Sequence, residues 1–70
     1  MIAVAEESDR VARVVRRAIE AFGDPVQARE WLERPNRVLQ GVAPIALLAT
    51  DAGVTQVTDE LGRIEYGELF

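Results

Sequence analysis

The 70-residue sequence contains neither cysteine nor histidine, and these two absences exclude several classes of chemistry. Without cysteine there are no disulfide staples and no thiolate catalysis, and without either residue there is no zinc finger and no histidine-based catalytic triad. Carboxylates remain as metal ligands, but no calcium loop of the pattern D-x-[DN]-x-[DN]-G is present. We therefore expect no catalytic residue, no metal site and no cofactor, and an enzyme is the least favoured class of function.

Basic charge and long apolar runs are also scarce. Eight basic residues, all arginine, stand against twelve acidic ones, which gives a formal net charge of −4 and disfavours a non-specific nucleic-acid binder. The longest apolar stretch, Gly41 to Ala49, is too short to cross a bilayer and contains Pro44. The first residues lack the basic segment of a signal peptide. We expect a cytoplasmic protein with no membrane contact.

The apolar content suffices for one small core. Leu, Ile, Val and Phe together account for 21 of the 70 residues, above the roughly 20% at which disorder becomes the default. A chain of this length has room for one domain, which buries about 60% of the surface exposed by the unfolded chain. We therefore expect a single domain over residues 1–70 whose stability is narrow enough to gain from a partner.

Apolar residues at steps of three and four predict an N-terminal helix that Ser8 caps and Gly23 ends. Asp24 and Pro25 are typical of the start of a second helix, which cannot easily pass Pro35. The apolar face of the first helix consists of Val11, Val14, Val15, Ala18 and Phe22.

The second half of the chain predicts short elements. The turn R-V-L-Q-G stops at Gly41, and Pro44 begins a short helix whose I-A-L-L-A segment is apolar almost all round, which indicates a buried position at the centre of the domain. Thr50 is a good N-cap for a last helix that ends at Gly67. Its core-facing stripe consists of Val54, Val57, Leu61 and Ile64. No alternating pattern predicts a strand. The fold class is therefore all-α, a compact orthogonal bundle of four to five short helices.

Three residues within this pattern have structural interpretations. Trp31 is more often the largest side chain of a small core than a platform for a ligand. Asn36 is interpreted as a turn or cap residue rather than a reader of adenine. Gly53 lies in the first turn of the last helix, where it costs about 1 kcal/mol relative to alanine, and we attribute it to close helix packing.

The face of the first helix opposite its apolar residues carries Arg10, Arg13 and Arg17. A solvated surface that pairs with nearby acids is the favoured interpretation of this stripe. A phosphate-binding stripe is the alternative, and the negative net charge disfavours it.

The last seven residues include Ile64, Tyr66, Leu69 and Phe70. Two interpretations of the end of the chain stay open. Leu69 and Phe70 either fold back to cover a gap in the core, or they form an exposed anchor for a pocket on a partner, where aromatic residues are favoured.

A longer pattern in one unbroken register extends over two thirds of the chain. The motif W-L-x-x-P-N-x-x-L-x-G-x-x-P occupies residues 31–44, and R-I-E-x-G follows at residues 63–67. This pattern resembles the toxin-binding domain of the Xre/MbcA/ParS family of antitoxins. Its structural positions here are Trp31, Leu32, Pro35, Asn36, Leu39, Gly41 and Pro44.

The resemblance implies an antitoxin that binds and neutralises a RES-domain toxin, an enzyme that consumes NAD⁺ or transfers its ADP-ribose. All catalytic residues would then lie on the partner, and the last helix and C-terminal tail of this chain would obstruct the active site. Residues 1–23 would form an N-terminal helix, 24–67 the family core and 68–70 the tail. The toxin-binding residues implied are Arg63, Ile64, Tyr66, Gly67, Glu68, Leu69 and Phe70.

Joined to the chemistry of the tail, the resemblance suggests how the obstruction works. A pocket for NAD⁺ offers donors to a pyrophosphate and flat apolar walls to two rings. Glu68 and the terminal carboxylate of Phe70 would take the anion positions, and the ring of Phe70 or Tyr66 would replace a base. Arg63 would face an acid on the toxin or serve only as a helix C-terminal charge.

The sequence departs from the family in two places. Many relatives carry an N-terminal helix-turn-helix, for which the residues before Phe22 leave no room, so direct DNA binding is not expected. Ala43 stands where relatives often have a capping serine, which weakens that helix start. Two alternatives remain: a DNA-associated regulator that uses Arg10, Arg13, Arg16 and Arg17, and an oligomerisation module that self-associates through Val11, Val14, Val15 and Ala18.

Overall fold

The computed structural model describes residues 2–67, with side chains from residue 9 onward. Within this range the only extended pairing is an isolated bridge between Asn36 and Val42, so no strand forms there. The predicted all-α class is confirmed, but the described residues form three α-helices and two single 3-10 turns rather than four or five helices. In chain order these elements are α1 (Ile2–Phe22), α2 (Pro25–Glu33), η1 (Arg37–Leu39), η2 (Pro44–Leu47) and α3 (Asp51–Tyr66).

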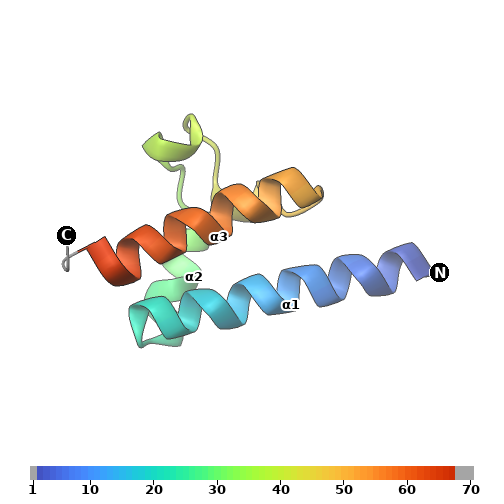
Figure 1. The fold of residues 1–70 in the computed structure, drawn as a ribbon, viewed down its shortest axis with the longest axis horizontal. Helices are drawn as coiled ribbons and strands as arrows, with labels where there is room; N and C mark the ends of the chain where they lie inside the picture. The colour runs from blue at the N-terminus through green and yellow to red at the C-terminus, as the bar shows by residue number, and fades with distance from the viewer. Residues whose placement is uncertain (1, 68–70) are drawn as a thin grey trace.

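Helices α1 and α3 lie side by side and run in the same direction, and α2 crosses them (Figure 1). The orthogonal arrangement predicted for the bundle therefore holds for α2 only. The loop that carries η1 stands on the side of α3 away from α1 (Figure 1). As a result α3 has α1 on one side and the η1 loop on another, and its C-terminal end leads out of the bundle.

Helix α1 begins at Ile2, so the predicted N-cap at Ser8 is wrong. Residues 2–7 contain no glycine or proline, and one serine inside a helix costs only a few tenths of a kcal/mol, so the helix passes through it. The predicted end is confirmed. Gly23 adopts the left-handed region with φ of 73°, and its N–H donates to the Ile19 carbonyl at 2.7 Å.

The other predicted helix starts follow local capping rules. The Asp24 carboxylate accepts a hydrogen bond from the Gln27 N–H at 3.2 Å at the start of α2. The Thr50 hydroxyl accepts from the Gly53 N–H at 3.0 Å at the start of α3. Each cap satisfies a backbone donor that has no partner inside its helix. Ala43 offers no such side-chain cap to η2, as its residue type predicts.

The core is built from one or two small or branched residues of each element. Because Val14 and Ala18 of α1 are 2% and 0% exposed inside this core, they are not available for self-association. An oligomerisation surface through the apolar face of α1 would have to compete with folding itself. The buried apolar side chains are Val14, Ala18, Ala28, Leu32, Leu39, Leu48, Val57 and Leu61.

The segment I-A-L-L-A does not form the buried central helix that its composition predicts. Its first three residues complete the single 3-10 turn η2, which begins at the buried Pro44 and ends at the partly buried Leu47, and the buried Leu48 follows. Ile45 stays 40% exposed. Since α3 is capped as early as Thr50, the chain has room for only one turn before that helix begins. A single turn places only one of its sides against the core, so the residues on its other side stay exposed.

Trp31 packs at the edge of the core rather than inside it. Its ring meets that of Phe22 with centroids 5.8 Å apart at 48°, a tilted geometry favourable for aromatic pairs. This contact joins the end of α1 to α2. Trp31 is thus a structural residue, as predicted, although it is partly rather than fully buried.

Gly53 marks the closest approach between η2 and α3. A Cβ atom built at this position would lie 2.7 Å from the Leu47 carbonyl carbon and would overlap the carbonyl oxygen. Gly53 itself is buried. The predicted role of this glycine in close helix packing is confirmed, because no larger residue fits without moving the backbone.

Among the described residues, no helix combines the length and apolar character required to cross a membrane.

Candidate toxin-binding site

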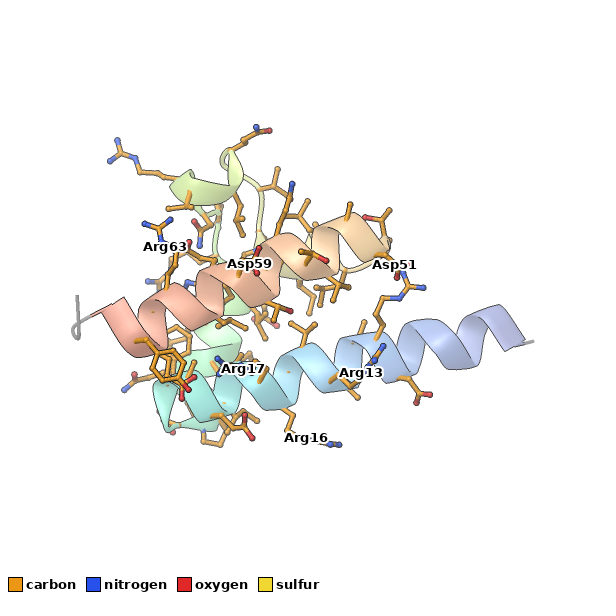
Figure 2. The ribbon with its side chains drawn as sticks, in the orientation of Figure 1. Arg13, Arg16, Arg17, Asp51, Asp59 and Arg63 are labelled. Carbon is orange, nitrogen blue, oxygen red and sulfur yellow. The ribbon has the colours of Figure 1, made fainter. Side chains whose placement is uncertain are left out.

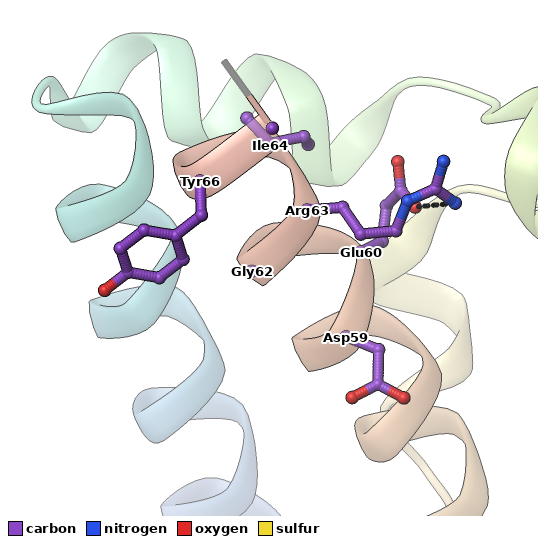
Figure 3. A pocket seen from close by; sticks show the side chains of 7 residues that line it. Asp59, Glu60, Gly62, Arg63, Ile64 and Tyr66 are labelled. Atoms are coloured by element: carbon purple, nitrogen blue, oxygen red, sulfur yellow. Dashed lines mark hydrogen bonds and ion pairs between the residues drawn. The ribbon is translucent and has the colours of Figure 1, made fainter. Parts of the chain in front are cut away.

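An open groove of about 760 Å³ lies along the last turns of α3 (Figure 3). We call it the end groove. It brings four of the predicted toxin-binding residues together with acidic residues one turn earlier. Its lining consists of Asp59, Glu60, Gly62, Arg63, Ile64, Tyr66 and Gly67.

The floor of the end groove is bare at Gly62, where an added Cβ would meet nothing within 4 Å. Arg63 and Tyr66 project to opposite sides of this glycine (Figure 3). The Arg63 side chain is 73% exposed and its guanidinium lies 3.4 Å from a Glu60 carboxylate oxygen. Tyr66 is 50% exposed. The groove therefore presents an aromatic ring and a cation that are accessible to a partner.

Chemically, this arrangement suits binding. Exposed Tyr and Arg side chains beside a flat, open floor are typical of the centres of protein interfaces. Among the side chains described, those of residues 9–67, no group of three or more acidic residues is arranged to hold a metal ion. The end groove therefore offers a partner an open surface with one exposed aromatic ring and one exposed cation.

Of the predicted toxin-binding residues, four lie in the end groove and three lie outside the described residues. Ile64 is half-buried and lines the end groove, and it is not among the side chains that pack against the core, where the core-facing stripe placed it. Gly67 follows the last residue of α3 with a right-handed conformation of φ −61°. Glu68, Leu69 and Phe70 lie outside the described residues, so both interpretations of the tail stay predictions.

Two arginines of α1 hold α3 at its two ends. At the start of α3, Arg10 donates to the Ala49 carbonyl at 3.0 Å and lies 3.7 Å from the Asp51 carboxylate. Near its end, Arg17 forms an ion pair with Glu65. Figure 2 shows Arg17 on the side of α1 that faces α3, whereas Arg16 points away from it. Two members of the arginine stripe therefore pair with acids, as predicted. They do so toward α3 rather than on a solvated face, since the side chains of Arg10 and Arg17 are only 18% and 26% exposed.

The ion pair between Arg17 and Glu65 is the more shielded of the two. The side chains are 26% and 28% exposed, and Glu65 Oε1 itself is out of contact with solvent without an aligned hydrogen bond. Glu65 stands between Ile64 and Tyr66, so this pair fixes the last turn of α3 and with it the end groove. Sequence reasoning singled out both residues but did not pair them, because nothing local connects positions 48 residues apart.

Removal of this pair gives a testable stability effect. Arg17→Ala leaves a shielded carboxylate without its cation, and we expect the free energy of unfolding to fall by about 1–2 kcal/mol, between the values for exposed and buried pairs. The exchanged pair, Arg17→Glu with Glu65→Arg, should recover part of this loss. Urea unfolding at pH 7 measures both.

The matched control is Arg34→Ala. Arg34 pairs with Glu30 at 3.7 Å, and the side chains are 73% and 58% exposed, so the expected loss is only about 0.3–0.5 kcal/mol. Equal losses for Arg17→Ala and Arg34→Ala would contradict a special role for the shielded pair.

Comparison with known proteins identifies the family. The profile described as Antitoxin Xre/MbcA/ParS C-terminal toxin-binding domain matches residues 17–67, which include every described residue of the end groove. The chain belongs to this family. The resemblance predicted from the motifs is thereby confirmed.

Curated relatives agree with this assignment. This antitoxin-family domain is similar to proteins named Antitoxin Xre from Photorhabdus laumondii subsp. laumondii (43% identity over 67 residues), Yersinia enterocolitica (41% over 66) and Pseudomonas putida (35% over 65). These matches cover 89–90% of this chain but only 41–45% of the relatives. The chain thus spans less than half the length of the curated relatives. No solved structure shows significant similarity to it.

Proposed function

We propose that this antitoxin-family domain binds a RES-domain toxin and neutralises it by obstructing the active site. The observation that carries the proposal is the position of the end groove. It lies within the matched family region and leaves Arg63 and Tyr66 exposed at the point where the chain continues into its last residues. The reaction blocked would be the consumption of NAD⁺ or the transfer of its ADP-ribose.

The chemistry of the last residues supports an obstruction of an NAD⁺ site. Such a site must offer hydrogen-bond donors or cations to a pyrophosphate, and Glu68 carries matching negative charge. The ring of Tyr66 or Phe70 matches a flat wall that otherwise holds a base. Arg63, being exposed, is available to meet an acidic group on the toxin.

Deletion of residues 67–70 tests this proposal. We expect the truncated chain to keep its helical content, because the buried core residues of the described range all precede position 67, and to lose neutralisation. The measurement is NAD⁺ consumption by the purified product of the neighbouring open reading frame, with and without the domain. Circular dichroism verifies that the truncated chain folds.

A truncated chain that inhibits as well as the full chain would show that the helices alone block the toxin. Absence of inhibition by the full chain, together with absence of binding, would overturn the proposed function itself.

DNA binding is the alternative that the arginine stripe raised. Of the four arginines that this alternative would use, Arg10 and Arg17 are drawn toward α3 by their ion pairs. The structure adds no observation that favours this alternative, and we do not propose it.

A further inference from the structure

A second groove adjoins the end groove on the opposite side of Arg63. This loop groove has a volume of about 300 Å³ and runs between the η1 loop and α3. It shares Asp59, Glu60 and Arg63 with the end groove, so the two form one continuous surface. Figure 2 shows Arg63 on the side of α3 that faces the η1 loop. The remaining lining residues are Val38, Leu39, Gln40, Val42, Leu47 and Gln56.

The loop groove is walled by apolar side chains that the fold leaves exposed. Val38 is 56% and Val42 38% exposed, whereas Leu39 between them is buried and anchors the loop in the core. The exposed part of each valine brings no stability to the folded chain, since that apolar surface stays in water. The two valines therefore occupy positions where a partner would gain by covering them.

The loop that carries the two valines is held by its own backbone. Asn36 accepts from the Gly41 N–H at 2.8 Å through its carbonyl, and its side chain accepts from the Val38 N–H at 2.9 Å. The Asn36 N–H donates to the Val42 carbonyl at 3.1 Å. Such a closed loop presents the valines in a fixed geometry, which lowers the entropy lost when a partner binds.

The size of a stable interface requires more than the end groove. Specific protein complexes bury about 800 Å² and 20–30 residues on each partner. The end groove has seven lining residues, well below that number. The toxin must therefore contact neighbouring surface, and the loop groove is the apolar surface that continues the end groove.

We propose that the toxin of the preceding subsection covers both grooves, with an apolar segment against Val38 and Val42 and a basic side chain near Asp59. This inference rests on the proposed function. The exposed carboxylate of Asp59 lines both grooves, and the domain carries a net charge of −4, so a cation on the toxin suits the junction of the two grooves.

The variants Val38→Lys and Val42→Lys test the inference, with Val26→Lys as the matched control. Val26 is 62% exposed on α2 and lines neither groove. Val26→Lys therefore adds the same positive charge at an exposed valine outside the proposed interface. A lysine inside the interface loses hydration and repels the basic group on the toxin. We expect the Kd for the toxin to rise by about tenfold or more for each groove variant, and by less than about twofold for Val26→Lys.

Affinity is measured by titration calorimetry with the purified product of the neighbouring open reading frame, at two salt concentrations. Thermal unfolding of each variant verifies its fold. If deletion of residues 67–70 weakens binding while both groove variants bind as the unchanged chain does, the inference is wrong and the proposed function stands. If the unchanged chain does not bind the toxin, both fail.

A second copy of this chain is the competing occupant of the loop groove. Sedimentation of the isolated chain decides this point. A dimer that Val38→Lys dissociates would overturn the inference, whereas a monomer unaffected by all three variants supports the toxin as the occupant.

Discussion

Replacement of Gly53 with alanine is expected to lower the free energy of unfolding by about 3 kcal/mol or more, the upper range for an added methyl group in a packed interior. The new Cβ overlaps the Leu47 carbonyl oxygen. Because that atom belongs to the backbone, the clash cannot be relieved by a rotation of a side chain. Either η2 or the first turn of α3 must move, and the cap from Thr50 to the Gly53 N–H would be lost with it.

The expected loss is a large fraction of the total for a domain of this size, which has about 4–10 kcal/mol of stability. Thermal unfolding followed by circular dichroism should show a fall in Tm of about 12–24 °C. Gly62→Ala is the matched control on the same helix, since its added Cβ meets nothing within 4 Å. It should raise stability by about 0.5–1 kcal/mol through helix propensity. A Gly53→Ala variant that melts within a few degrees of the unchanged chain would refute the close contact.

Replacement of Gly62 with tryptophan is expected to abolish toxin binding without unfolding the domain. An added Cβ at Gly62 meets nothing within 4 Å and the end groove beyond it is open, so we expect folding to be spared. The same indole fills the end groove and keeps a partner away from Arg63 and Tyr66. We expect a loss of affinity of about 100-fold or more, equivalent to about 3 kcal/mol.

Two controls separate steric obstruction from other causes. Gly62→Ala should bind as the unchanged chain does, since a methyl group fills little of the groove. Ala52→Trp places the same bulky residue at the exposed start of α3, away from both grooves, and should also bind normally. Normal binding by Gly62→Trp would mean that the end groove is not the surface that meets the toxin.

The parts of the fold that were correctly predicted depend on short-range interactions. The caps at Asp24 and Thr50 and the left-handed Gly23 each involve residues within four positions of one another, so the residue types suffice to predict them. The predictions for the start of α1 and for the form of the I-A-L-L-A segment were wrong. In the first case the favourable run before Ser8 outweighed one capping residue, and in the second the nearby start of α3 left only one turn.

The candidate site shows the same division. Arg63, Ile64, Tyr66 and Gly67 were singled out from sequence because they stand in one short motif, and the structure brings them into one groove. Nothing in the sequence indicated that Val38 and Val42 line a groove, because residue type alone does not tell an exposed valine from a buried one.

The sequence by itself determined the helical class, most helix ends and the membership of an antitoxin domain family. These follow from residue types, from periodicity and from short motifs. Only the tertiary structure decided which side of α3 stays open, which acid Arg17 meets, which backbone atom leaves no room for a Cβ at position 53, and that a second apolar groove adjoins the first. Each of these depends on segments distant in the chain that packing brings together, and the pattern of any one segment does not contain that contact.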